Sequence, residues 1–85
     1  RQSRDQLDRG SASILLNLAE GAGRFARADK AQFYVIARGS AMECAAVLDV
    51  LLSRGLLQAS VHRHARGLLV RVTQMLTKLA VRMQR

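Results

Sequence analysis

The stretch NLAEGAGRFAR, from Asn17 to Arg27, holds residue types that can bind phosphate: Gly21 and Gly23, with arginines beside them. Glycine-rich loops cradle phosphate when several backbone N–H groups point at one anion. A dinucleotide loop needs three glycines between a strand and a helix, and a P-loop needs Gly-Lys-Ser/Thr after its second glycine. Neither pattern is present. We therefore interpret the stretch as a turn between two helices, with Gly21 as the C-cap of the first.

Glu20 would then stand at a helix C-terminus, where the helix dipole repels a carboxylate. Arg24 and Arg38 are the candidate partners for it. Arg38 follows a continuous apolar run, where an unpaired charge is costly. We expect Glu20 to pair with Arg38 across two helices, with Asn17 joining them in a structural polar cluster. Glu43 is an alternative partner for Arg38, although a spacing of five is poor on one helix.

No other residues form a convincing catalytic or metal site. His62 and His64 are two residues apart, so a helix points them about 200° apart and they cannot share one metal ion. Cys44 lies among small apolar residues and is expected in the core. Cys44 with His62 would lack an orienting acid, because no carboxylate follows Asp49 in the chain. The sequence predicts no catalytic residue, no metal and no cofactor.

Composition indicates one small helical domain spanning residues 1–85. The chain is 49% hydrophobic but only 4% aromatic, and it has no proline. Leu, Val and Ala dominate, which favours helices packed on helices. A single cysteine excludes an internal disulfide, and charged residues interrupt every long apolar stretch. We expect a soluble cytoplasmic protein that does not insert into a membrane.

The charge is high and unevenly distributed. Fourteen Lys and Arg oppose six Asp and Glu, which gives a net charge of +8. A basic half of this kind attracts phosphate backbones or acidic surfaces. At 100° per residue, the basic residues of the last segment fall on one face of a helix. The candidate nucleic-acid-binding residues are Arg63, Arg66, Arg71, Lys78, Arg82 and Arg85.

Three helices are expected, at about residues 4–20, 28–54 and 60–84. Asp29 suits the first turn of the second helix, Gly55 its C-terminal end, and Ser60 the N-cap of the third. Apolar or small residues recur at helical spacing in the first and third segments. The expected seams are Leu7, Ser11, Ile14 and Leu18 in the first, and Val61, Ala65, Leu68, Val72, Leu76, Leu79 and Met83 in the third. The small residues 10–13 would let a neighbouring helix approach closely.

The second segment is apolar around most of its circumference. Residues 33–37 are consecutively apolar, and residues 44–52 are apolar except for Asp49. A helix of this kind is usually buried on several sides. Three helices alone cannot cover it that fully. We therefore expect a fourth helix, other subunits, or both, to complete its burial.

QLDRGSASILLNLAEGAGR followed by QFYVIARGSAMECAAVLDVLLSRGLL resembles the four helix bundle protein family. That family includes proteins encoded in intervening sequences of bacterial large-subunit ribosomal RNA genes. More distantly, the chain is similar to the accessory variability determinant of diversity-generating retroelements. The matching positions are Gln6, Leu7, Arg9, Ser13, Ile14, Asn17, Ala19, Glu20, Gly21, Gly23 and Arg24, then Phe33, Ile36, Ala37, Arg38, Gly39, Ser40 and Glu43. Two departures are a family helix before the first block, absent here, and a family proline replaced by Leu15 and Leu16.

The resemblance implies an antiparallel four-helix bundle, with its first helix missing or truncated in this chain. It also implies assembly into a ring-like homo-oligomer, commonly a pentamer. No catalytic activity is established for the family, which predicts a non-enzymatic protein. The retroelement relatives imply an adaptor that works with a reverse transcriptase and its RNA.

Two hypotheses of function follow. The first is an accessory protein that binds RNA or DNA backbones through the basic helix face without reading sequence. The second is an oligomeric scaffold whose basic face meets an acidic protein partner, such as a reverse transcriptase. The run of basic residues after Asp49 favours the first.

Overall fold

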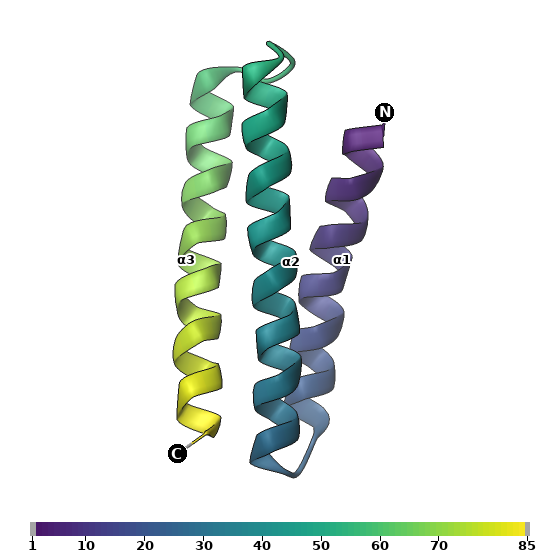
Figure 1. Ribbon diagram of the computed structural model, residues 1–85, viewed down its shortest axis with the longest axis vertical. Helices are drawn as coiled ribbons and strands as arrows, with labels where there is room; N and C mark the ends of the chain where they lie inside the picture. Colours follow the sequence, from purple (N-terminus) through teal and green to yellow (C-terminus); the bar gives the residue numbers. More distant parts are fainter. Residues whose placement is uncertain (1, 85) are drawn as a thin grey trace.

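The computed structural model describes residues 2–84, in which the regular structure is three helices. These are α1 (Gln2–Gly23), α2 (Arg27–Ser53) and α3 (Ala59–Met83), each within three residues of its expected bounds. The helices run down, up and down in a layer of 44 × 21 × 13 Å, with α2 in the middle (Figure 1). The all-α class is therefore confirmed. The described residues supply three helices of the expected bundle, not four.

α1 continues through Gly21 to Gly23, so the prediction that Gly21 caps this helix is wrong. Gly21 is buried against α2, where a Cβ at this position would lie 2.7 Å from Tyr34 Cε1. The glycine is needed for the close approach of two helices, not for a left-handed turn. Lys30 closes the helix end instead, because its Nζ donates to the carbonyls of Gly21 (3.2 Å) and Ala22 (3.0 Å).

The connection from α2 to α3 follows the sequence prediction. Gly55 adopts φ 70°, the left-handed conformation that glycine tolerates best. Its N–H donates to the carbonyl of Leu52 (3.0 Å), and the N–H of Leu56 donates to that of Leu51 (2.9 Å). These two bonds form a Schellman motif, which satisfies carbonyls at the end of α2.

α3 begins at Ala59, so the prediction that Ser60 is its N-cap is wrong. Gln58 holds the N-cap position with extended backbone (φ −66°, ψ 142°), and its carbonyl accepts from the N–H of His62 (2.9 Å). No side chain caps this helix end. The loop that leaves Gly55 sets where α3 starts, and it overrides the preference of serine for the N-cap. Asp29, by contrast, lies in the first turn of α2 as predicted.

The core lies along the inner face of α2, where small residues admit both neighbouring helices. Ala37 and Ala41 are fully buried. Near the end of the bundle that holds the α1–α2 turn, Tyr34 and Ala37 pack with Leu76 and Ala80 of α3. In the middle of the bundle, Ala41 and Cys44 pack with Ile14 of α1. Leu18 and Val72 contact both clusters, so one continuous core joins the three helices.

The expected seams hold only in part. Ser11 is exposed and donates to the carbonyl of Leu7 (2.8 Å), and Val61 and Leu68 of α3 are 48% and 45% exposed. Leu69 is partly buried and packs on the core in place of Leu68. α3 packs against α2 and not across the layer against α1. Only the side of α3 that faces α2 is therefore covered. Because consecutive residues of a helix are about 100° apart, Leu69 faces α2 while Leu68 points away from it.

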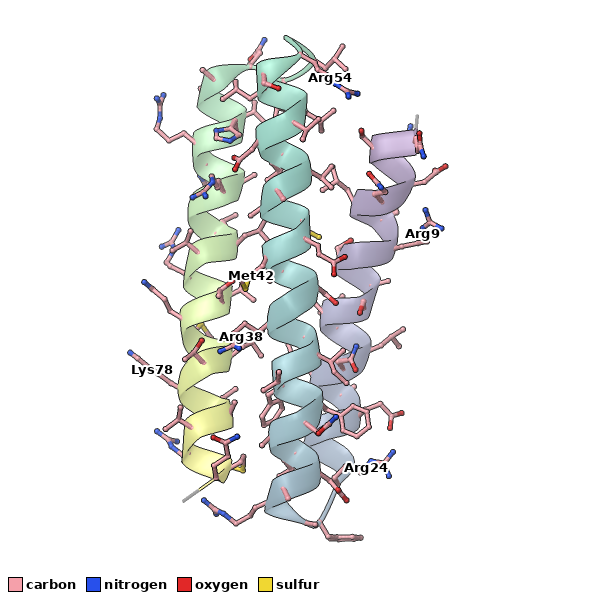
Figure 2. The ribbon with its side chains drawn as sticks, in the orientation of Figure 1. Arg9, Arg24, Arg38, Met42, Arg54 and Lys78 are labelled. Atoms are coloured by element: carbon pink, nitrogen blue, oxygen red, sulfur yellow. The ribbon has the colours of Figure 1, made fainter. Side chains whose placement is uncertain are left out.

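The outer face of α2 carries the apolar residues that the sequence predicted to be buried. Val35 (41%), Ile36 (43%), Met42 (57%) and Val50 (42%) are exposed in the isolated chain. Figure 2 shows Met42 on this helix. Because α2 is the middle helix, α1 and α3 cover its sides and inner face but leave this outer face open.

Candidate nucleic-acid interface

α3 carries a line of cations on the face that points away from α2. Its packing face is fixed by Leu76 and Ala80, which are 2% and 4% exposed. On the opposite face lie four exposed basic residues, which we call the basic ridge: Arg63, Arg71, Lys78 and Arg82. Figure 2 shows Lys78 extending outward from α3. The ridge follows from helical periodicity, because basic and apolar residues in this segment alternate with a period close to 3.6.

The ridge is long and free of acidic residues. Arg63 and Arg82 are nineteen positions apart, which corresponds to about 28 Å at the helical rise of about 1.5 Å per residue. No Asp or Glu occurs after Asp49 in the chain. Four cations on a rigid helix, without a carboxylate on the same helix, form a surface that attracts an extended polyanion.

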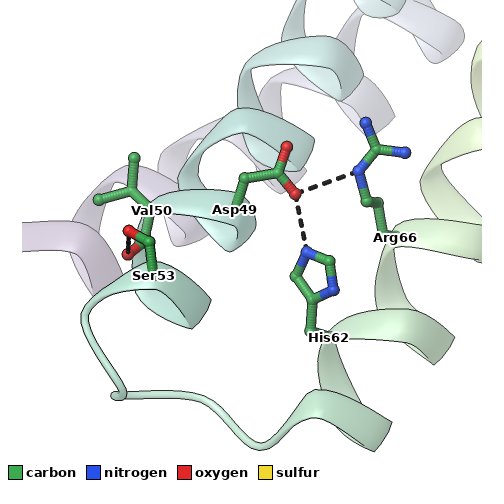
Figure 3. A network of polar contacts seen from close by, with 5 residues as sticks. All are labelled: Asp49, Val50, Ser53, His62 and Arg66. Atoms are coloured by element: carbon green, nitrogen blue, oxygen red, sulfur yellow. Dashed lines mark hydrogen bonds and ion pairs between the residues drawn. The ribbon is translucent and has the colours of Figure 1, made fainter.

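Arg66 was predicted to belong to this ridge, and the structure places it elsewhere. Its Nε donates to Asp49 Oδ1 of α2 at 3.1 Å, and the same oxygen accepts from His62 Nε2 at 2.7 Å (Figure 3). The hydrogen bond from His62, and then the charge of Arg66, hold the pKa of Asp49 below its ordinary value. The three side chains join α2 to α3 near the turn between them. Among the described residues, Arg66 therefore has a carboxylate partner and the four ridge cations have none. Arg85 lies outside these residues.

The end of the ridge meets the turn between α1 and α2. Arg27, the first residue of α2, donates from Nη2 to the backbone carbonyl of Arg82. A cation at a helix C-terminus interacts favourably with the helix dipole and adds a donor to the last carbonyls of the helix. The side chain of Arg82 stays exposed. The turn and the last part of the ridge therefore share one corner of the molecule.

The predicted cluster of Asn17, Glu20 and Arg38 does not form. Glu20 Oε2 accepts from Arg24 Nη2 at 3.2 Å, and both side chains are exposed. Arg38 lies on the side of α2 that faces α3, where its Nη1 donates to Thr77 Oγ1 at 3.4 Å (Figure 2). The pairing fails because α1 and α3 contact different sides of α2. Of the two candidate partners for Glu20, Arg24 is therefore the correct one.

Asn17 belongs instead to a polar contact between α1 and α2. Its Nδ2 donates to the carbonyl of Ser13 (2.8 Å), and Ser13 shares a hydrogen bond with Ser40 of α2 (2.7 Å). Nearby, a Cβ on Gly10 would lie 2.5 Å from Cys44 Sγ. The prediction that small residues in α1 allow close approach is thus confirmed at Gly10. The partners on α2 could not be identified from the sequence, because register between helices is not a local property.

His62 pairs with a carboxylate and Cys44 packs in the core, whereas His64 is exposed. Among the described residues, no three His, Cys, Asp or Glu side chains converge as metal ligands would. His62 is held by Asp49, and His64 is exposed. Cys44 is buried, and desolvation together with the charge of Glu43 raises the pKa of its thiol. The thiol is therefore protonated at neutral pH, which is the poorly nucleophilic form.

Sequence reasoning passed over Phe25, the most exposed large apolar residue of the described chain at 101%. It lies between α1 and α2, in the turn that begins at Arg24. The available signal was an aromatic residue flanked by arginines in a segment already interpreted as a turn.

The family model described as 23S rRNA-intervening sequence protein matches residues 1–78. No curated protein and no solved structure matches the chain significantly. Within residues 2–84, none of the three helices combines the length and the hydropathy of a membrane span.

Proposed function

The chain belongs to the 23S rRNA-intervening sequence protein family, and from this premise we propose that it is a non-enzymatic accessory protein that binds RNA or DNA backbones. The observation that supports this proposal is the basic ridge. Its four exposed cations lie along one side of a rigid helix, and the nearby acidic residue Asp49 is already engaged by His62 and Arg66. A surface of this kind grips phosphates without reading base edges.

The proposal includes assembly into a homo-oligomer. Val35, Ile36, Met42 and Val50 leave an apolar strip open on the outer face of α2, and such strips commonly mark protein contacts. The pentameric ring and the fourth helix come from the family resemblance. An oligomer would present several ridges to one polyanion, and linked contacts raise avidity without new chemistry. Light scattering at micromolar concentration tests this part, and a stable monomer would contradict it.

The ridge is tested by changing Arg71, Lys78 and Arg82 together to Gln. Each phosphate contact releases condensed counterions. The logarithm of the binding constant therefore falls linearly with the logarithm of the salt concentration, with a slope of about −0.7 to −0.9 per contact. Four ridge contacts per subunit predict a slope of about −2.8 to −3.6, and the triple variant should retain about −0.7 to −0.9. The fold should survive because these side chains point away from Leu76 and Ala80.

A matched control changes Arg4, Arg9 and Arg54 to Gln. These residues are exposed and lie off the ridge, and their loss lowers the net charge of +8 by the same three units. The control variant should keep the salt slope of the parent within about one unit. Equal losses of affinity and of salt slope in both variants would show that net charge, not the ridge, drives binding.

The alternative function is a scaffold for an acidic protein partner. It predicts a folded parent that retards neither RNA nor DNA at tens of micromolar and roughly physiological ionic strength. That result would overturn the nucleic-acid proposal.

A further inference from the structure

Phe25 exposes its whole aromatic ring, and no packing in the described structure explains why an aromatic residue stands there. The other aromatic side chains, Phe33 and Tyr34, are partly or fully buried along α2, whereas Phe25 is 101% exposed. It stands in the short connection between α1, which ends at Gly23, and α2, which begins at Arg27. A polar residue in such a turn would avoid exposing a whole apolar ring to water. The ring is therefore available to a partner.

The surroundings of Phe25 are basic on balance. Arg24 precedes it and Arg27 follows it, while Arg82 reaches the same corner through its carbonyl. Two acids lie near in the chain. Glu20 is engaged by Arg24, and Asp29 lies exposed in the first turn of α2. A partner that contacts the ring must therefore be compatible with the positive charge that the protein places around it.

The position of the ring relative to the ridge further limits the chemical class of the partner. The hydrogen bond from Arg27 to the carbonyl of Arg82 holds the turn beside the end of the ridge. Figure 1 shows the same relation, because the α1–α2 turn and the C-terminal end of α3 lie at the same end of the layer. A strand that continues past Arg82 around the end of α3 comes to the turn that holds Phe25.

From this juxtaposition we infer that Phe25 is a stacking platform for an unpaired base, placed at the end of the basic ridge. The inference rests on the proposed function, because the ridge supplies the grip on the backbone. Every base has a π-face that stacks on an aromatic ring, so the platform needs no particular sequence. Bases inside a duplex are covered on both faces by their neighbours. The ring therefore makes the protein prefer single-stranded nucleic acid over a duplex without ends.

Charge favours this occupant over a second copy of the chain. A second copy docked through the same corner would bring Arg24, Arg27 and Arg82 of both copies together, which places like charges in contact. A single strand brings phosphates to the arginines and a base to the ring at the same time.

Fluorescence provides a direct test, because the chain has no tryptophan. Phe25→Trp would introduce the only indole, and a stacked base should quench its emission. An oligothymidylate of about 20 nucleotides should quench it in a saturable way, and a closed circular duplex should not. Leu56→Trp is the matched control, since Leu56 is 69% exposed in the other interhelical turn, at the opposite end of the layer.

Phe25→Ala measures the contribution of the ring to affinity. Loss of one stacked base should weaken binding to the oligothymidylate by about 5- to 150-fold. Affinity for the circular duplex and its salt slope should stay unchanged, because the ridge is intact.

The outcomes separate the two proposals. If the parent binds both nucleic acids and Phe25→Ala weakens neither, the platform is wrong and the ridge stands. If the parent binds neither, both proposals fail. If Phe25→Ala changes the oligomer size measured by light scattering, the ring belongs to a contact between subunits, and the platform is overturned. Equal quenching at both tryptophan positions would also overturn it.

Discussion

Replacing Gly21 with Ala tests the packing of α1 on α2. A Cβ at this position would lie 2.7 Å from Tyr34 Cε1, 3.1 Å from Tyr34 Cδ1 and 3.2 Å from the Cβ of Phe33. Ordinary contacts of this kind begin near 3.4 Å. The Tyr34 ring also packs against Leu76 and Ala80 of α3, so it cannot retreat without disturbing the second interface. The methyl group must therefore push α1 away from α2.

Two opposing effects set the size of the change. Alanine is a better helix former than glycine by about 1 kcal/mol in a helix interior, and by less near a helix end. Overpacking a close contact costs about 1–3 kcal/mol. Because one of the three contacted atoms is a Cβ fixed to the backbone, the upper part of that range applies. We expect Gly21→Ala to lower the free energy of unfolding by about 1–2 kcal/mol.

Gly67→Ala is the matched control. Gly67 lies inside α3, and a Cβ there would meet no atom within 4 Å. Only the helix-propensity effect remains, so this variant should be more stable by about 0.5–1 kcal/mol. Urea unfolding at one fixed protein concentration gives both values, because the midpoint shifts while the slope reports any change in exposed surface. If Gly21→Ala stabilises the protein as Gly67→Ala does, the close contact with Tyr34 is absent and our account of this interface is wrong.

Two further predictions concern the charged pairs. The pKa of Asp49 is lowered in the folded state. This carboxylate therefore stabilises the fold fully when the pH is above its unfolded pKa, near 3.8. The stabilisation is lost as the pH falls through the lower pKa of the folded state. Asp49→Asn should therefore be less stable than the parent at neutral pH, and urea unfolding at decreasing pH should show the difference vanish in acid below about pH 4; a constant difference would contradict the pairing. Glu20→Gln should change stability by no more than about 0.5 kcal/mol, because Glu20 and Arg24 form an exposed pair and the helix dipole opposes the carboxylate. A loss of several kcal/mol in the same unfolding measurement would restore the buried pairing with Arg38.

Sequence alone determined the features that depend on one stretch of backbone. The end of α2 could be predicted because Gly55 is suited to the positive φ of a Schellman motif. The basic ridge could be predicted because a helix repeats every 3.6 residues, wherever it is packed. The three helices were predicted to within a few residues for the same reason: their signals lie within a turn or two of the chain.

The tertiary structure decided which side chains meet. Arg38 bonds to Thr77 rather than to Glu20, and Leu69 rather than Leu68 packs on the core. Gly21 lies inside α1, where the absence of a side chain leaves space for Tyr34. Each outcome depends on the rotation and offset of one helix relative to another. Those quantities are fixed by close packing between residues far apart in the chain, such as Gly10 against Cys44, and no local pattern encodes them. Phe25 lies in the turn that a hydrogen bond between residues 27 and 82 joins to the end of α3, and this contact too links residues far apart in the chain.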